Sequence, residues 1–150
     1  MTTTMTLADL TTRTGLDVLD HLEREVTIPV VDGLQAQGDL IVIPHALLEG
    51  VTVSEHARRR EVPSAGIELL RSAAGGNPHT VAADPGTCYW TARVVDPQGL
   101  ALGMIETTAI AYLIHPEHGG TGIAPGRYVI RRQRERGEGT SRTSDRLVAD

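Results

Sequence analysis

The fold expected for this chain is decided by the stretch Ala111-Tyr112-Leu113-Ile114-His115-Pro116-Glu117-His118, the Gly119-Gly120 turn and the segment Ala124-Pro125-Gly126-Arg127-Tyr128-Val129-Ile130. An apolar run ends in two histidines and a carboxylate, a glycine-rich turn follows, and a second alternating run begins. This order predicts a strand, a polar loop, a tight turn and another strand. The polar loop therefore lies at the mouth of a β-structure and is the first candidate for a functional site.

The other apolar segments are short, and turn signals separate them at intervals of about ten residues. They include residues 40–43, 88–95 and 100–106. Short strands joined by Gly and Pro turns are typical of antiparallel barrels and sandwiches. We therefore predict a mainly β domain over residues 26–136, built as a small antiparallel β-barrel or sandwich.

Helical signals precede the β-segments. Thr6 and Asp9 fit a capping box that would open a short helix, which Gly15 interrupts. Further along, apolar residues at helical spacing predict an amphipathic helix with one buried stripe, made of Leu16, Leu19, Leu22 and Val26. We therefore expect an N-terminal helical segment over residues 1–25, its stripe covered by the domain or by a second copy. Residues 137–150 are expected to form a flexible polar tail.

The hydrophobic core must be aliphatic, because the chain contains no Phe, one Trp and three Tyr. Alternation along the expected strands predicts that six side chains are mostly buried: Ile41, Ile43, Val94, Ile110, Tyr112 and Ile130.

Composition narrows the class of protein. A length of 150 residues favours one domain, and a net charge of −5 argues against a nucleic-acid partner, which binds through phosphate neutralisation. Cys88 is the single cysteine, so the chain cannot form an internal disulfide. The sequence has no apolar run of about 20 residues and no secretory signal pattern at its start. We therefore expect a soluble, cytoplasmic protein with no membrane partner.

Three segments together resemble a known group. They are Gln37-Gly38-Asp39-Leu40 leading into Ile43-Pro44, the loop His115-Pro116-Glu117-His118, and the run Pro125-Gly126-Arg127-Tyr128-Val129-Ile130-Arg131-Arg132-Gln133-Arg134-Glu135. This order resembles small, largely uncharacterised bacterial and phage-associated β-rich proteins with the pattern QGD, GHxH, HxEH and PPGxYxVxRQREY. The resemblance spans roughly residues 35–135, with a similar Val148-Ala149-Asp150 end, and it implies an architecture and a site rather than an activity.

The chain departs from that pattern in two places. Asn77 stands where the group has the first histidine of GHxH, and Arg136 stands where a tyrosine would follow Gln133-Arg134-Glu135. The first departure removes a potential metal ligand.

The candidate metal ligands are His79, His115, Glu117 and His118. Neutral imidazoles and a carboxylate suit a divalent transition metal such as Zn, Fe, Mn or Ni. Because the start of one strand and the end of another can share a rim, we expect at least three of these side chains to lie within mutual reach. In the other interpretation, which we favour, no cofactor is bound, His115 and Glu117 hydrogen-bond the turn, and His118 faces solvent.

Other catalytic arrangements find little support. Cys88 lies in an apolar segment without a neighbouring basic residue that would activate it, so a core position is the simpler interpretation. The sequence contains no nucleophile elbow, phosphate-binding loop or dinucleotide fingerprint. The arginines of residues 131–136 and 58–60 are interspersed with or flanked by glutamates, which is typical of solvated, charge-guarded strands.

Two functions from different classes follow. The first is a non-enzymatic β-domain that acts through protein–protein association, as an assembly, decoration or accessory component or as a homo-oligomer. The second is a cupin-like, metal-dependent small-molecule enzyme or sensor that uses the His/Glu cluster. We favour the first because the sequence lacks a catalytic motif, which leaves enzyme activity as the alternative.

Overall fold

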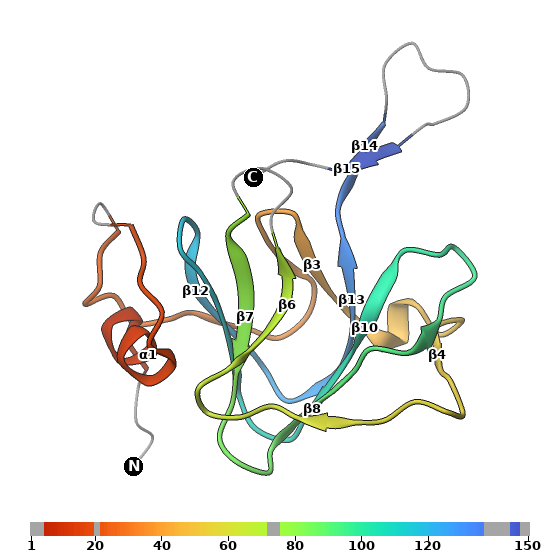
Figure 1. Ribbon diagram of the computed structural model, residues 1–150, viewed down its shortest axis with the longest axis horizontal. Helices are drawn as coiled ribbons and strands as arrows, with labels where there is room; N and C mark the ends of the chain where they lie inside the picture. Colours follow the sequence, from red (N-terminus) through yellow and green to blue (C-terminus); the bar gives the residue numbers. More distant parts are fainter. Residues whose placement is uncertain (1–4, 20–21, 72–75, 137–144, 148–150) are drawn as a thin grey trace.

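The computed structural model describes residues 5–19, 22–71, 76–136 and 145–147, and Figure 1 shows its elements. One short helix precedes two large β-sheets, which confirms the predicted mainly β class. Neither sheet closes into a barrel. Of the two architectures that the sequence left open, the structure therefore has the sandwich-like one.

The first sheet has five strands in the order β1-β12-β11-β7-β6. Its strands are β1 (Val30–Val31), β12 (Gly119–Ile123), β11 (Ala111–His115), β7 (Pro78–Ala82) and β6 (Ile67–Arg71). The short β1 pairs with β12 in parallel, and the other neighbours are antiparallel. The decisive stretch of the sequence forms the β11–β12 hairpin, whose turn is residues 116–118. The predicted glycine turn was wrong, because Gly119–Ile123 is strand β12, whose glycines leave room for Ile28 and Val30. The second predicted run is a strand, β13 (Gly126–Arg132), but it belongs to the other sheet.

The second sheet has six antiparallel strands in the order β2-β3-β13-β10-β8-β5. Its strands are β2 (Gln35–Gln37), β3 (Leu40–Pro44), β13 (Gly126–Arg132), β10 (Ala101–Thr107), β8 (Cys88–Thr91) and β5 (Arg60–Glu61). A 3₁₀ turn, η1 (His45–Leu47), follows β3.

Two small ribbons complete the fold. They are β4 (Thr52–Val53) with β9 (Val94–Val95), and β14 (Arg134–Arg136) with β15 (Asp145–Leu147). The β14–β15 ribbon continues from β13 and extends away from the sandwich (Figure 1). Of the expected polar tail, residues 137–144 and 148–150 lie outside the described residues.

The main core fills the space between the two sheets. Leu40 and Val42 of β3 and Ile105 of β10 meet Val81 of β7 and Leu113 of β11 there, each fully buried. Because side chains alternate along a strand, the other residues of each strand face outward. On the outer side of the six-stranded sheet, Val51 and the β4–β9 ribbon cover Met104 and Val129 in a smaller cluster.

Of the six side chains predicted to be mostly buried, Ile130 belongs to the fully buried core and none of the other five is exposed. Ile130 is fully buried, whereas Ile41, Ile43, Val94, Ile110 and Tyr112 are only partly buried. In β3 the inward residues are Leu40 and Val42. The run Leu40-Ile41-Val42-Ile43 is apolar throughout, so its pattern does not say which alternate set points inward.

The N-terminal helix lies earlier than its strongest pattern predicted. Helix α1 spans Leu7–Thr14, with the expected capping box between Thr6 and Asp9, and Gly15 ends it in a left-handed conformation (φ 70°). The helix predicted from the Leu16, Leu19, Leu22 and Val26 stripe is wrong, because residues 15–19 and 22–29 contain no helix.

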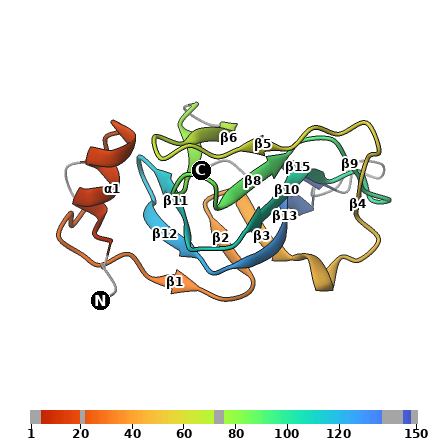
Figure 2. The same cartoon turned by 90° about the horizontal axis from the view of Figure 1, so that it is seen from below.

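The helix packs on the outer face of the five-stranded sheet. Leu7 and Leu10 form a cluster with Ile28, Ile114 of β11 and Ala82 of β7, and Leu16 and Leu22 pack against its border. Figure 2 shows α1 beside β11 and β12. The leucines that suggested a second helix therefore cover the sheet from an irregular segment, while Leu19 and Val26 remain exposed.

Candidate functional site

The motifs of the resemblance converge at one end of the sandwich. The β2–β3 turn, the start of β7, the β11–β12 turn and the end of β13 meet there, at the top of Figure 1. We call the side chains gathered there the histidine end: Gln37, Asp39, Asn77, His79, His115, Glu117, His118 and Arg132. Polar contacts thus join segments that lie far apart in the sequence, such as Asp39 and Arg132.

His79 is the centre of this end and is fully buried. Its Nδ1 lies 3.0 Å from Oε1 of Gln37, and its Nε2 lies 3.0 Å from Oδ1 of Asp39. The Gln37 amide nitrogen donates to the carbonyls of Leu113 (3.1 Å) and Gly119 (3.3 Å), which fixes the amide oxygen as the group that faces His79. His79 therefore donates from Nδ1 to Gln37.

The contact between His79 and Asp39 holds one proton. Because Nδ1 of His79 is already protonated, Nε2 either donates to a carboxylate or accepts from a carboxylic acid. In both cases the pair is neutral as a whole. Asp39 is itself fully buried, and its Oδ2 lies 3.3 Å from Nε of Arg132. The Asp39 carboxyl group therefore lies between His79 and Arg132.

His115 has a different role. Its ring, also fully buried, accepts two backbone hydrogen bonds at Nδ1, from the N–H of Glu117 (3.1 Å) and the N–H of His118 (3.3 Å). A nitrogen that accepts carries no proton, so His115 is the neutral tautomer protonated at Nε2. The three-residue turn from Pro116 is closed by Gly119 in a left-handed conformation (φ 78°), which glycine adopts without strain.

The three imidazoles form a bent row with His115 at the corner. The ring centroids of His79 and His115 are 4.3 Å apart, those of His115 and His118 are 4.6 Å apart, and the outer rings, 6.5 Å apart, are nearly parallel. His118 is exposed, whereas the other two are buried. The row thus runs from the surface to the buried Asp39.

Glu117 is turned toward a different partner. Asn77 donates from Nδ2 to Oε1 of Glu117 at 2.5 Å, so the residue two positions before His79 holds the carboxylate of the β11–β12 turn. Of the four sequence-predicted site residues, the structure thus places His79, His115 and His118 in one row and directs Glu117 to Asn77.

The arrangement occupies nitrogens that a metal would need. Both ring nitrogens of His79 and Nδ1 of His115 are engaged in hydrogen bonds. Within the described residues, no group of three or more His, Cys, Asp or Glu side chains has a geometry that could hold a metal ion. The contacts of His115 with the turn and the exposure of His118 agree with two parts of the hydrogen-bonded interpretation. The Glu117 carboxylate, which was expected to bond the turn, accepts from Asn77 instead.

Sequence reasoning did not include Gln37, Asp39 and Arg132 among the site residues. Gln37 and Asp39 belong to the QGD motif and Arg132 to the last motif, so the resemblance was the signal that could have identified them. Asp39 also accepts a backbone hydrogen bond from Gln133 at its carbonyl, which ties the β2–β3 turn to the end of β13.

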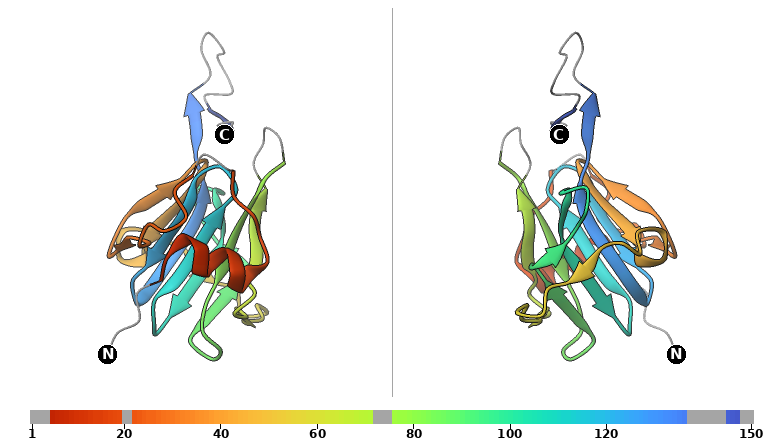
Figure 3. Two further views of the ribbon diagram at one scale, coloured as in Figure 1. Left: turned by 90° about the vertical axis from the view of Figure 1, so that its left-hand side faces the viewer. Right: turned by 90° about the vertical axis from the view of Figure 1, so that its right-hand side faces the viewer.

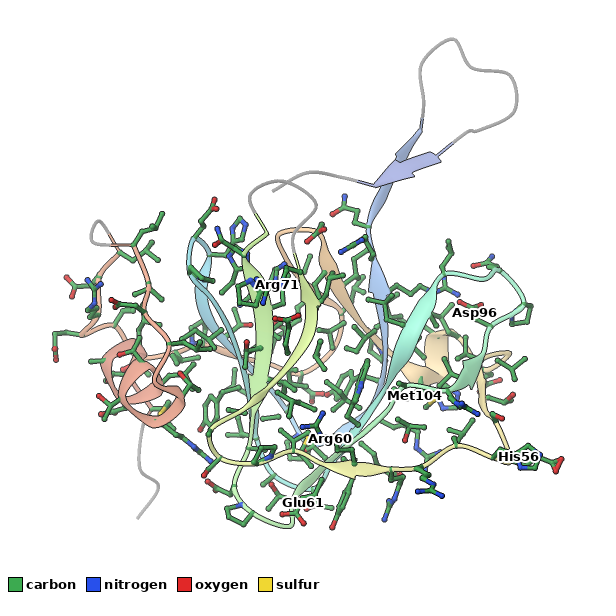
Figure 4. The ribbon with its side chains drawn as sticks, viewed as in Figure 1. His56, Arg60, Glu61, Arg71, Asp96 and Met104 are labelled. Carbon is green, nitrogen blue, oxygen red and sulfur yellow. The ribbon has the colours of Figure 1, made fainter. Side chains whose placement is uncertain are left out.

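A second buried charge cluster lies on the outer side of the six-stranded sheet. The Asp96 carboxylate accepts from the N–H groups of Gln98, Leu100 and Ala101 and pairs with Arg131 at 3.1 Å. Burial alone would raise the pKa of Asp96, but these hydrogen bonds and the Arg131 charge outweigh it and lower the pKa. Figure 4 shows Asp96 in the loop beside β10, away from the histidine end. These contacts hold the loop after β9 in place. The Asp96 carboxylate is engaged by them and therefore has a structural role.

Cys88 is confirmed as a core residue. Its side chain is fully buried, and this burial raises the pKa of the thiol to about 11. A thiol in that state is a poor nucleophile at neutral pH.

Comparison with known proteins gives a family. The family described as Domain of unknown function (DUF8820) matches residues 36–133, the span that holds the QGD, His79 and HxEH segments. The chain belongs to the DUF8820 family. No curated protein and no solved structure is detectably similar to it. None of the helices in the part of the chain that the structure describes has the length and hydropathy to cross a lipid bilayer.

Proposed function

We propose that this DUF8820 chain is a non-enzymatic association module that binds a protein partner through the outer face of β2 and β3. The support comes from where apolar side chains remain exposed. Leu34 and Leu47 are 60% and 65% exposed, the two highest values among the large hydrophobic residues of the described chain. They flank the β2–β3 hairpin, Leu34 just before β2 and Leu47 in η1 just after β3.

The hairpin itself extends this apolar surface. Gln37, Leu40 and Val42 point into the sandwich, so the alternate residues Ala36, Ile41 and Ile43 point outward. Ala36 is exposed, and Ile41 and Ile43 are partly exposed. We call Leu34, Ala36, Ile41 and Ile43 the β2–β3 face. Apolar surface that is contiguous and solvent-exposed is typical of protein–protein contact sites.

The histidine end fits this function as a structural device. Gln37 and Asp39 hold the β2–β3 turn to β7 and β13 through His79 and Arg132, which fixes the hairpin on the sheet. A rigid hairpin presents its outer face in one conformation, so less conformational entropy is lost when a partner binds.

Site-specific photo-cross-linking tests the proposal. A benzophenone amino acid at Leu34 should give one discrete cross-linked product in cells that produce the chain, because the β2–β3 face is covered by a partner. The matched control is the same probe at Val95, which is 55% exposed on the β4–β9 ribbon. A product at Leu34 and none at Val95 supports the proposal, whereas equal or absent products at the two positions contradict it.

A second candidate function is metal-dependent sensing or catalysis at the histidine end, which the row of three imidazoles favours. Metal binding through either nitrogen of His79, or through Nδ1 of His115, would require that ring to give up its present hydrogen bonds. Zn²⁺ and Ni²⁺ titration of untagged protein at pH 7.5 and 5.5 tests it: stoichiometric binding that weakens at pH 5.5 would support a metal site, because imidazole ligands must be neutral. Absence of binding at pH 7.5 would leave a hydrogen-bonded structural cluster.

A further inference from the structure

The two large sheets end in four edge strands, β1, β6, β2 and β5. An edge strand presents unpaired backbone N–H and C=O groups, and proteins that stay monomeric guard such edges with charges, prolines, bulges or very short strands. A comparison of the four edges therefore shows which of them is open to another strand.

Three of the four edges are guarded. Strand β5 consists of Arg60 and Glu61, and β6 carries Glu68 and Arg71 together with a register shift. Figure 4 labels Arg60, Glu61 and Arg71 on these strands. Strand β1 is only two residues long and lies between Pro29 and Asp32.

Strand β2 is one residue longer than β1 and β5 and has no charge, proline or bulge. The segment Leu34-Gln35-Ala36-Gln37 contains no charge and no proline, and its pairing with β3 is regular. The β2–β3 hairpin, orange in Figure 3, forms the lateral edge of the molecule in both views. The backbone groups of β2 that point away from β3 thus lie beside an apolar face.

We propose that β2 pairs antiparallel with β2 of a second copy across a two-fold axis, which joins the two six-stranded sheets into one continuous sheet. This inference rests on the proposed function and names its partner. Antiparallel pairing of a strand with itself is self-complementary, as a two-fold interface requires.

The side chains of β2 suit a copy of the same chain. With Ala36 near the axis, Gln35 of one copy lies opposite Gln37 of the other. No charged side chains of β2 therefore face each other, although each chain has a net charge of −5. The small Ala36 side chain lets the two strands approach, and the two β2–β3 faces become one apolar surface across the junction. A partner of different sequence would not need this symmetry.

Sedimentation equilibrium with edge variants tests the pairing. The wild-type chain should have twice its monomer mass of 16.1 kDa. Ala36→Lys places the charge that natural edges use at the axis and should reduce the mass to that of the monomer. The matched control is Ala65→Lys, at an exposed turn residue before β6, which should keep the dimer mass. Circular dichroism spectra and melting curves show whether each variant is folded.

A cysteine variant gives an independent measurement. Under mild oxidation Ala36→Cys should form a covalent dimer in high yield, because the two residues at position 36 face each other across the axis, whereas Ala65→Cys should not. The native Cys88 does not interfere, since it is fully buried.

The outcomes separate this inference from the proposed function. A monomeric wild type without an Ala36→Cys dimer, or an Ala36→Lys variant that stays dimeric, overturns β2 pairing. If the probe at Leu34 then captures a protein other than a second copy, the proposed function stands and only its partner is wrong. If neither experiment gives a product, both fail.

Discussion

Among single residues, Asp39 makes the contacts on which the histidine end depends, because its carboxyl group meets both His79 and Arg132. The pair of His79 and Asp39 is neutral by itself, and Arg132 adds a positive charge beside it. Buried charges are tolerated only when each has its partner, because removal of one member leaves the others desolvated and unpaired.

Asp39→Ala should therefore destabilise the fold by roughly 3–5 kcal/mol, the usual loss when a buried ionic contact is broken on one side. The substitution removes the partner of Nε2 of His79 and the ion-pair partner of Arg132 together. Urea unfolding at pH 7 measures the effect. The control Glu55→Ala removes an exposed carboxylate and should change the free energy by less than about 0.5 kcal/mol. Equal effects of the two changes would contradict a stabilising role for the network.

Asp96 gives a pH-dependent prediction. Because its pKa is lower in the folded chain than in the unfolded chain, folding favours the ionised carboxylate. This contribution is fully present above the unfolded pKa of about 3.9 and is lost as the pH falls through the folded pKa. At pH 6, Asp96→Asn should be less stable than wild type by about 1–3 kcal/mol.

The difference between wild type and Asp96→Asn should shrink as the pH falls below about 4, since the wild-type residue then becomes protonated as well. Urea unfolding curves at pH 6, 4 and 3 measure it. A difference that is the same at all three pH values would mean that ionisation of Asp96 does not contribute to stability.

At the scale of elements, close contact between β10 and β8 requires a residue without a side chain. A Cβ atom at Gly103 would lie 2.5 Å from the carbonyl oxygen of Thr91 and 2.5 Å from the ring of Trp90. The first contact is with backbone, which cannot rotate away, and Gly103 is also next to the register shift in β10.

Gly103→Ala should therefore lower the free energy of unfolding by about 1–3 kcal/mol, the usual effect of overpacking. The control is Gly50→Ala: its added Cβ would lie at an ordinary 3.6 Å from Pro97, and Gly50 has no positive φ. Thermal unfolding of the two variants compares them. A melting temperature of Gly103→Ala equal to that of Gly50→Ala would show that the two strands separate without strain.

Some of the helices, strands and turns could be predicted from the sequence, and others could not. The strand that ends at His115 and the capping box at Thr6 followed from local patterns, because turn residues and caps act over a few positions. The shared rim of His79 and His115 followed instead from the expected antiparallel order of the strands. The helix predicted from the Leu16 to Val26 stripe is absent from the described residues 16–19 and 22–26, since spacing alone cannot tell a helix from an irregular segment whose leucines pack on a sheet.

The contacts of His79 with Gln37 and Asp39 could not follow from local patterns. They join positions 42 and 40 residues apart, and their geometry depends on how β2, β3 and β7 pack. The inward residues of β3 were equally undetermined, because all four residues of the run Leu40-Ile41-Val42-Ile43 are apolar and packing alone chooses between the alternate sets.

At the scale of the whole molecule, the proposed pairing through β2 would link association to stability. If native chains are dimers and unfolded chains are monomers, dilution favours unfolding by mass action. A 100-fold rise in concentration then stabilises each dimer by about 3 kcal/mol, because RT ln 100 has that value near the melting temperature.

The melting temperature should therefore depend on protein concentration. The unfolding entropy of two chains of this length is about 0.6 kcal/mol/K, so a 100-fold rise should increase the melting temperature by about 4–5 °C. Differential scanning calorimetry at low concentration and fluorescence-detected melting over the full range measure the shift. Ala36→Lys should melt at one temperature throughout, because its folded state is already monomeric. A wild-type melting temperature that stays constant over the 100-fold range would contradict a dimer whose dissociation is coupled to unfolding.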